Sequence, residues 1–167
     1  IACISICSCV KEQLEVTYNK QEDQINSYIE NAMKKDTSYT HVNMNGSNRL
    51  TLVQGTGEEL DPDGSITFYY AGYIFNGNVN ASNMFITNRK ASADDAKWDL
   101  TDYNFEPLTI NLKDDKLLKG LKDGLTGVKA GEECEILFSG KYGFGKKAFG
   151  MIPANSALLY KIWVISI

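Results

Sequence analysis

The sequence predicts an α+β fold, in which a twisted antiparallel sheet wraps around one short helix and an amphipathic helix precedes both. Apolar residues recur at helical spacing in the polar N-terminal part of the chain and again in residues 117–125. Elsewhere, short runs alternate apolar and polar residues and end at Gly, Pro or Asn, which is the pattern of strands joined by turns. The 167 residues suit one domain with a real core plus an additional segment.

Residues 1–10, IACISICSCV, form the first predicted unit, a signal-peptide remnant with a lipobox. This run of small and branched apolar residues stops abruptly at charged sequence, as the end of a secretory signal does. Residues 6–9, ICSC, resemble a bacterial lipobox, in which a small residue precedes the acylated cysteine, so we predict lipid attachment at Cys9. A remnant without lipid is the alternative, and Cys3 is a second candidate. Because His41 is the only histidine and no second cysteine cluster follows, we predict no metal site.

Residues 11–45 form the second predicted unit, an N-terminal helix and a linker. The sequence is polar from about Lys11 to Lys35, and its few apolar residues lie at helical spacing, at Ile25, Ile29, Ala32 and Met33. Residues 36–38, DTS, are the predicted break after the helix. We expect this narrow apolar stripe to dock on the domain while the helix also serves as a spacer. A dimerisation arm is the alternative.

Residues 46–167 form the third predicted unit, the sheet domain. Residues 117–125 carry leucines at helical spacing between Asp114-Asp115 and Gly124, so we predict a short helix there. Cys134 alternates with two apolar residues and is therefore predicted to be a buried core thiol. The predicted strands are NRLTLV (48–53), SITFYYAGYIF (65–75), PLTINL (107–112), EECEILF (132–138) and SALLYKIWVISI (156–167).

Residues 78–106 interrupt the sheet domain with a long polar stretch that has no clear period. A connection of this length inside a compact domain is usually functional or loosely ordered. We therefore predict an enlarged loop, and its aromatic residues are Phe85, Trp98, Tyr103 and Phe105.

Residues 139–147, SGKYGFGKK, nearly match the phosphate-binding pattern G-x-x-x-x-G-K-[ST]. Such a loop must lie between a strand and a helix N-terminus, because backbone N–H groups and the helix dipole hold the anion. The strand is present, but AFGMIP at residues 148–153 cannot begin a helix of useful length. Lys147 also stands where a Ser or Thr would bind magnesium. The stretch therefore predicts no nucleotide site.

The same stretch resembles the C-terminal third of FKBP-type peptidyl-prolyl isomerases. LFSGKYGFGKKAFGMIPANSALLYKIWVI matches that family's strand, aromatic-glycine corner, loop, Gly-x-Ile-Pro motif and last strand. Upstream, YYAGYIFNG resembles the family's HYTG motif, and PLTINLKDDKLLKGLKDGLTGVKAGEE resembles its strand, short helix and turn. The resemblance extends from about Arg49 to Ile167, and it implies an FKBP-like fold for the sheet domain.

The resemblance implies which residues form the family's apolar pocket. The implied catalytic positions are Tyr70, Phe85, Leu118, Phe144 and Tyr160. The implied substrate-binding positions are Leu108, Leu117, Leu121, Met151 and Ile152. Among them, Leu118 takes the position whose backbone N–H contacts the ligand, and Leu121 takes that of the pocket floor. Taken singly, each residue is also typical of an ordinary core.

The chemistry that the resemblance implies requires no acid, base, metal or cofactor. Its barrier is amide resonance, about 18–20 kcal/mol for an ordinary peptide bond, and an apolar site that favours the twisted amide lowers it. Three positions depart from the family. Ile86 replaces an acidic residue, Leu121 replaces a larger aromatic floor, and Phe144 lacks the hydroxyl of the usual Tyr. An alternative alignment places Val79-Asn80 at the acidic position, again without a carboxylate, so we predict reduced activity.

The leading hypothesis for function is therefore a peptidyl-prolyl isomerase or folding helper in a bacterial cell envelope. The resemblance implies proline-containing segments of exported proteins as partners, and the lipobox implies a membrane anchor that faces the periplasm or the exterior. The alternative is a catalytically weak FKBP-like module that binds a peptide or protein. The net charge of −4, with scattered Lys and Arg, argues against nucleic acid. The sequence does not indicate an oligomeric state.

Overall fold

The computed structural model describes residues 3–113 and 116–167. Asp114-Asp115, the predicted boundary of the short helix, lie outside the described residues. The elements in chain order are α1 (Cys3–Lys35), β1 (Thr40–Met44), β2 (Ser47–Val53), β3 (Ser65–Phe75), η1 (Ala81–Asn83), β4 (Met84–Thr87), α2 (Lys90–Asp95), β5 (Leu108–Asn111), α3 (Lys119–Leu125), β6 (Glu133–Phe138), η2 (Gly140–Tyr142) and β7 (Ala157–Ser166).

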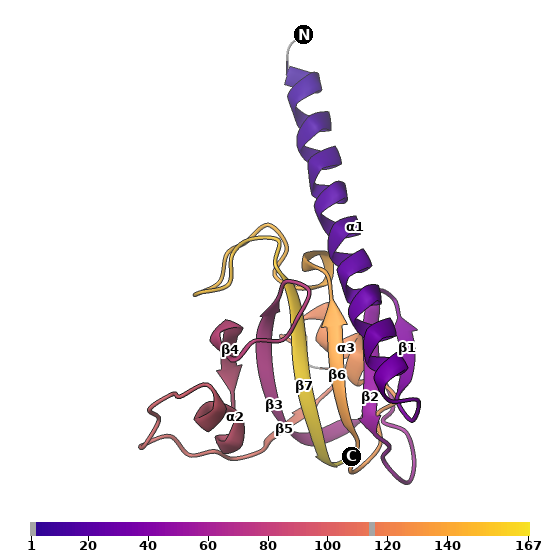
Figure 1. Cartoon of the computed structure of the whole chain (residues 1–167), viewed down its shortest axis with the longest axis vertical. Coiled ribbons are helices and arrows are strands. Elements are labelled where there is room, and N and C mark those ends of the chain that lie inside the picture. Colours follow the sequence, from indigo (N-terminus) through magenta and orange to yellow (C-terminus); the bar gives the residue numbers. More distant parts are fainter. Residues whose placement is uncertain (1–2, 114–115) are drawn as a thin grey trace.

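One seven-stranded antiparallel sheet forms the domain, as predicted. Its main path has the order β1-β2-β6-β7-β3-β4, and β5 pairs with β3 beyond this path. The two long strands β3 and β7 pair from Thr67 to Phe75 and form the centre of the sheet. Figure 1 shows the strongly twisted sheet with α1 in front of it and the short helix α3 behind it.

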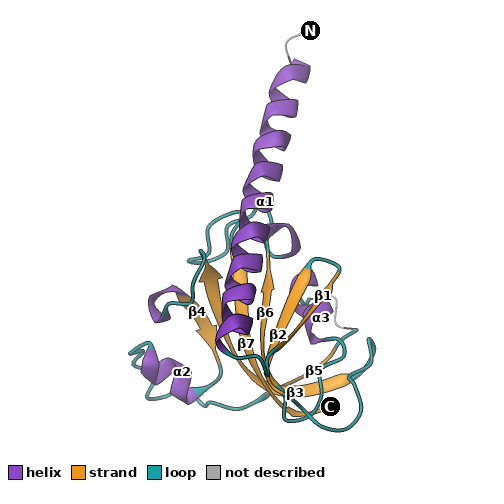
Figure 2. Cartoon of the chain, turned by 45° about the vertical axis from the view of Figure 1, so that its right-hand side comes forward, coloured by secondary structure: helices purple, strands orange, loops and turns teal. Residues whose placement is uncertain are grey.

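The sheet is buried on both faces, and the alternation along β6 shows why. Cys134, Ile136 and Phe138 pack with the leucines of α3 on one face, which confirms the predicted core position of Cys134. Leu137 points the other way and packs with Ile25 of α1. Successive side chains of a strand point to opposite faces, so the apolar runs of this sheet serve two separate cores. Figure 2 shows the helices on either side of the strands.

Helix α1 is longer than the sequence predicts and begins at Cys3 rather than near Lys11. No Gly or Pro interrupts the chain between Cys3 and Lys35, so nothing stops the helix at residue 10. Its C-terminal half docks through the buried Ile25 and Ile29, as the apolar stripe predicts. Its N-terminal half extends beyond the domain (Figure 1). In the described part of the chain, no helix is long and apolar enough to cross a membrane.

A β-hairpin replaces the linker that the sequence predicts at residues 36–45. The turn at residues 36–38 is confirmed, but β1 then pairs with β2 through Thr40↔Thr51 to Met44↔Ser47. The connecting Asn45 and Gly46 have φ of 55° and 90°, as in the two-residue turn that this dipeptide favours. The Asn-Gly pair was the available sequence signal for this hairpin.

Residues 78–106, predicted as an enlarged loop, contain η1, β4 and α2. β4 adds an edge strand beside β3 through Ala71↔Thr87 and Gly72↔Ile86. Its four residues, MFIT, are too short to show a period in sequence, so only pairing with β3 defines the strand. The remainder of the segment packs inward through Trp98, against the core that contains Ile25.

Candidate functional site

An apolar pocket of about 310 Å³ lies between the sheet, α3 and the loop that follows η2. Four clefts in the described part of the chain are larger. Two of about 630 and 600 Å³ flank α1, and charged and polar side chains dominate their linings. The other two, of about 350 and 380 Å³, are lined by a mixture of polar and apolar residues and contain no aromatic side chain. Apolar ligand pockets with a few convergent polar groups are the usual small-ligand sites of proteins. The apolar pocket is therefore the candidate functional site.

Seven of the predicted site residues converge on this pocket from five parts of the chain. Two come from the central strands, one from the edge strand β5, three from α3 and the residues before it, and one from the loop after η2. These residues are Tyr70, Leu108, Leu117, Leu118, Leu121, Phe144 and Tyr160.

The other three predicted residues are not among those lining the pocket. Phe85 packs edge-on against Tyr160, with ring centroids 5.8 Å apart, and therefore supports a pocket wall from behind. Ile152 is buried in the core that contains α3. The side chain of Met151 is 57% exposed at the loop tip. Any contact of these three with a ligand stays a prediction.

Four further residues line the pocket, namely Phe68, Ile86, Lys116 and Phe149. Phe149 stacks face to face on Phe144, with centroids 4.9 Å apart and planes 6° apart, while remaining 64% exposed. No periodic pattern marks Phe149 in the sequence, because a loop residue has no strand or helix neighbours to set its direction. Phe149 and Phe144 together form one aromatic wall.

Ile86 of β4 forms part of the pocket wall and is apolar. It is one of the two positions at which the resemblance places the family's carboxylate, and which of them corresponds stays a prediction. Among the described lining residues, only Lys116 carries a charge. The pocket therefore offers a low-dielectric environment, in which hydrogen bonds to a ligand are stronger than in water.

Tyr70 is held in place by the first residues after β4. The amide oxygen of Asn88 accepts a hydrogen bond from the Tyr70 N–H at 2.6 Å, and the Asn88 N–H donates to the Tyr70 carbonyl at 3.2 Å. The Asn88 side chain also donates to Glu106 O at 3.0 Å, so one buried amide joins β3 to the end of the long insertion. Asn88 is a positioning residue that the sequence pattern did not reveal.

The two tyrosines of the pocket keep their protons at neutral pH. Burial, and then the neighbouring Tyr70, raise the pKa of Tyr160. Burial, and then the neighbouring Tyr103, raise the pKa of Tyr70. Both phenols therefore remain neutral O–H donors, which suits a site that binds a carbonyl oxygen.

Helix α3 brings its leucines to the pocket because it packs very closely on the sheet. A Cβ atom on Gly120 would lie 2.2 Å from the ring of Phe138, so only glycine permits this approach. The Ser47 hydroxyl of β2 donates a hydrogen bond to the Gly120 carbonyl at 2.6 Å. Leu121, the predicted pocket floor, follows directly.

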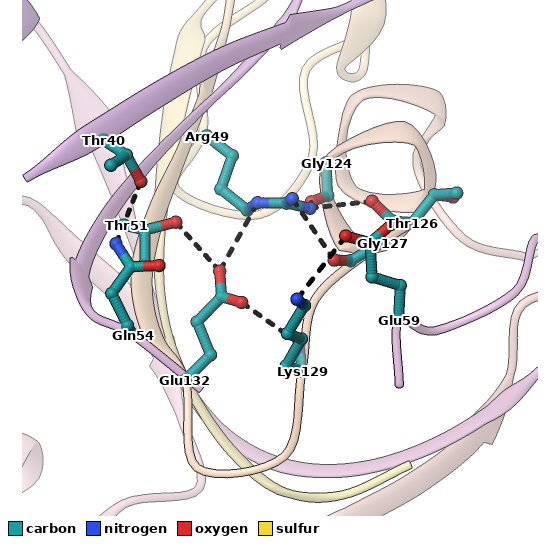
Figure 3. A network of polar contacts seen from close by, with 10 residues as sticks. All are labelled: Thr40, Arg49, Thr51, Gln54, Glu59, Gly124, Thr126, Gly127, Lys129 and Glu132. Atoms are coloured by element: carbon teal, nitrogen blue, oxygen red, sulfur yellow. Dashed lines mark hydrogen bonds and ion pairs between the residues drawn. The ribbon is translucent and has the colours of Figure 1, made fainter. Parts of the chain in front are cut away.

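Arg49 of β2 fixes the C-terminal end of α3, as Figure 3 shows. Its guanidinium donates to the carbonyls of Gly124 at 2.9 Å and Thr126 at 2.7 Å, two groups that the end of a helix leaves without partners. Its Nε lies 3.4 Å from Glu132 Oε1, and the Thr51 hydroxyl donates to the same oxygen at 2.9 Å. This nearly buried ion pair connects the end of α3 to β2 and to the residue before β6.

Comparisons with known proteins find sequences and structures similar to this chain. Residues 57–165 match the family model of the FKBP-type peptidyl-prolyl cis-trans isomerases. The chain is 25% identical to FK506-binding protein 1 of Aspergillus oryzae over 122 residues, which cover 73% of this chain and 98% of that protein. It is also 25% identical to the FKBP-type peptidyl-prolyl cis-trans isomerase FkpA of Buchnera aphidicola over 161 residues, which cover 95% of this chain and 56% of that protein.

A solved structure shows the same fold. The peptidyl-prolyl cis-trans isomerase of Pseudomonas syringae pv. tomato superposes with a TM-score of 0.60 at 16% sequence identity. The superposition covers 91% of this chain and 93% of that one. This likeness confirms the predicted FKBP-like fold.

Proposed function

Because the chain belongs to the family of FKBP-type peptidyl-prolyl cis-trans isomerases, we propose that it isomerises Xaa-Pro bonds in segments of exported polypeptides. The convergence of seven predicted positions on one apolar, aromatic pocket is the observation that carries the proposal. A proline ring and the side chain before it are apolar groups of a size that such a pocket accepts.

The pocket acts by favouring the twisted amide over the planar one. A planar amide is stabilised by charge separation that water solvates, and the twisted amide has lost much of this separation. An apolar lining therefore disfavours the planar form relative to the transition state. The protonated phenols of Tyr70 and Tyr160 are the candidate donors to the amide oxygens of the bound peptide. The backbone N–H of Leu118, the residue before the first turn of α3, is a third candidate donor.

We expect the isomerase activity to be lower than that of a family member that carries the expected polar and aromatic residues at these positions. Ile86, Leu121 and Phe144 each line the pocket without the polar or larger aromatic group that the resemblance expects. A lost hydrogen bond costs about 0.5–1.5 kcal/mol, and a smaller floor costs on the order of 1 kcal/mol in buried apolar area. Together these changes remove about one to two decades of rate, at roughly tenfold per 1.4 kcal/mol.

The test is exchange NMR on a Leu-Pro-containing peptide with catalytic amounts of the full chain. The cis and trans signals should exchange markedly faster than the uncatalysed tens to hundreds of seconds. Phe149→Ala removes an exposed pocket wall and should slow this exchange. Val42→Ala removes an exposed apolar side chain of β1 that does not line the pocket, and it should leave the exchange rate unchanged. Phe144→Tyr restores a hydroxyl and should raise the rate about fivefold. An unchanged exchange rate in the presence of the wild-type chain defeats the enzyme proposal.

A binding module without efficient turnover is the second candidate, and the apolar Ile86 on the pocket wall favours it. In that case the peptide shifts protein resonances around Tyr70 and Tyr160 while its cis and trans signals exchange at the uncatalysed rate. The same titration therefore separates the two candidates.

We further propose that the chain is anchored to a bacterial envelope by a lipid on Cys9, facing the periplasm or the cell exterior. The lipobox-like ICSC supports this, and so does the exposed position of Cys9 on the part of α1 that extends from the domain. Mass spectrometry of the protein extracted from membranes tests it. A free thiol at Cys9 in all of the extracted protein contradicts the anchor.

A further inference from the structure

The pocket loop, residues 140–155, carries the aromatic wall formed by Phe144 and Phe149, and its two ends meet backbone to backbone. A Cβ atom on Gly140 would lie 2.5 Å from the carbonyl carbon and oxygen of Asn155. The Gly145 N–H donates to Gly140 O at 3.0 Å, and the Asn155 N–H donates to Gly145 O at 2.6 Å. We call these three residues the loop neck.

Two backbone groups of the loop neck point to α1, and a single side chain binds both. The Oε1 atom of Gln21 accepts a hydrogen bond from the Gly140 N–H at 2.9 Å. The Nε2 atom of the same side chain donates to the Asn155 carbonyl at 2.7 Å. A carboxamide can do this because it carries a donor and an acceptor side by side. Gln21 thereby joins the first residue of the loop to the last.

Tyr18 adds a third bond, since its hydroxyl donates to Asn155 Oδ1 at 3.0 Å. Asn155 has a φ of 58°, a left-handed conformation that costs energy in a residue other than glycine and therefore depends on its surroundings. Gln21 lies one helical turn before the fully buried Ile25, so docking of the apolar stripe also sets the position of Gln21. Figure 1 shows α1 passing beside the start of the loop at the top of the sheet.

We propose that α1 holds the pocket loop in its binding conformation through Gln21, a role that rests on the proposed peptide site. A loop that is already ordered loses less conformational entropy when a peptide contacts Phe144 and Phe149. Gln21 is a positioning residue, because it bonds the loop neck and not the pocket. By ordering the loop, Gln21 stabilises the bound peptide equally in the ground state and in the transition state. Its loss should therefore raise KM and leave kcat nearly unchanged.

The test compares Gln21→Ala with Gln13→Ala in the full chain. Both substitutions remove the same carboxamide from the same helix, but Gln13 is exposed. In Gln21→Ala the Gly140 amide should exchange with solvent about tenfold faster or more, since it loses its acceptor. KM for a Leu-Pro peptide should rise about fivefold, with kcat within about twofold of wild type. Gln13→Ala should match the wild-type chain in all three quantities.

Gln21→Glu separates the two bonds. Its carboxylate can accept from Gly140 but cannot donate to the Asn155 carbonyl. Protection of the Gly140 amide should therefore return, while KM stays above the wild-type value. Glutamate has nearly the same shape as glutamine and keeps its packing, so a KM that stays raised reports the lost bond to Asn155. A wild-type KM in Gln21→Glu would mean that the packing of this side chain, and not the clasp on both loop ends, sets the pocket.

Two further outcomes overturn the proposal. One is Gly140 exchange in Gln21→Ala at the wild-type rate, which means that the clasp does not hold the loop. The other is faster Gly140 exchange with an unchanged KM, which means that the loop neck does not govern the pocket. A wild-type chain that neither binds nor isomerises the peptide defeats the proposed function instead, because amide exchange still reports the clasp.

Discussion

Gly72 is a residue on which the pocket depends sterically, and it lies in the middle of β3. A Cβ atom there would come within 2.8–2.9 Å of Phe85, Ile86 and Tyr160, three side chains of the pocket and its support. The sequence contains this glycine inside an apolar run, where glycine usually weakens a strand. The structure supplies the reason for its presence, which is the close approach of three side chains from two other strands.

Gly72→Ala should therefore distort the pocket while the fold persists. The added methyl group forces at least one of its three neighbours to move by several tenths of an ångström, and overpacking of this kind costs about 1–3 kcal/mol. Urea denaturation should show this loss, and the peptide should bind more weakly than to wild type. Wild-type stability together with wild-type affinity would show that the neighbours yield without cost.

Cys134 should be unreactive in the folded protein. Burial, and then the nearby Glu132 carboxylate, raise the pKa of the Cys134 thiol, and the thiolate is the form that reacts. In a Cys3→Ser, Cys7→Ser, Cys9→Ser chain, a thiol reagent such as Ellman's reagent should label Cys134 only at the rate of unfolding. In a wild-type chain produced without the lipid, the exposed Cys9 should react at once. Prompt labelling of the triple variant under native conditions contradicts the buried position.

Among the elements, α3 depends most on contacts made by other parts of the chain. It has seven residues, too few to be stable alone. Its leucines predict a helix, but its position relative to the sheet depends on Gly120 against Phe138 and on the cap provided by Arg49. The predicted start at residue 117 is also two residues early, because Leu117 and Leu118 line the pocket before α3 begins.

Arg49→Met should strongly destabilise the domain. Methionine keeps an apolar stem of similar length but leaves Glu132 and the last carbonyls of α3 without the guanidinium. The ion pair is nearly buried, since the side chains of Arg49 and Glu132 are 11% and 5% exposed. Breaking a buried pair in this way costs about 3–5 kcal/mol. Lys90→Met removes an exposed ion pair with Asp94 and should cost less than about 1 kcal/mol. Equal free energies of unfolding for the two variants would contradict the role of Arg49.

At the scale of the whole molecule, α1 and α3 cover opposite faces of one sheet. α3 contributes to the pocket side, and α1 covers the other side through Ile25 and Ile29. Tyr28 joins α1 to β6, because its hydroxyl donates to Glu135 Oε2 at 2.7 Å. This hydrogen bond connects the N-terminal helix to β6, a central strand that pairs with β7.

The stability that Tyr28 contributes should fall in alkaline solution. Burial, and then the charge and hydrogen bond of Glu135, raise the pKa of Tyr28 above its ordinary value near 10. Below pH about 10 both the folded and the unfolded chain keep this proton, so the contribution is fully present. Above it the unfolded chain loses the proton first, and the contribution declines as pH rises.

Urea denaturation of wild type and Tyr28→Phe between pH about 8 and 11 measures this effect. The difference in the free energy of unfolding between the two chains should shrink as pH rises. A difference that stays constant over this range would show that the pKa of Tyr28 is not raised in the folded state.

The sequence by itself determined the strands at 65–75, 132–138 and 156–167, the short helix, and the docking stripe of Ile25 and Ile29. These features are periodic, and periodicity follows from local backbone geometry. The family resemblance also identified the leucines and tyrosines that converge on the pocket, because its motifs keep their order along the chain.

Only the tertiary structure decided which loop residues complete the pocket and what holds them. Phe149 stacks on Phe144, five residues away in sequence. Asn88 bonds Tyr70 of β3, and Gln21 bonds Asn155, 134 residues further along the chain. A single aromatic or amide residue in a polar stretch carries no period, so its partner is set by how the chain returns on itself. For the same reason β4 could not be predicted, since its strand exists through pairing with β3.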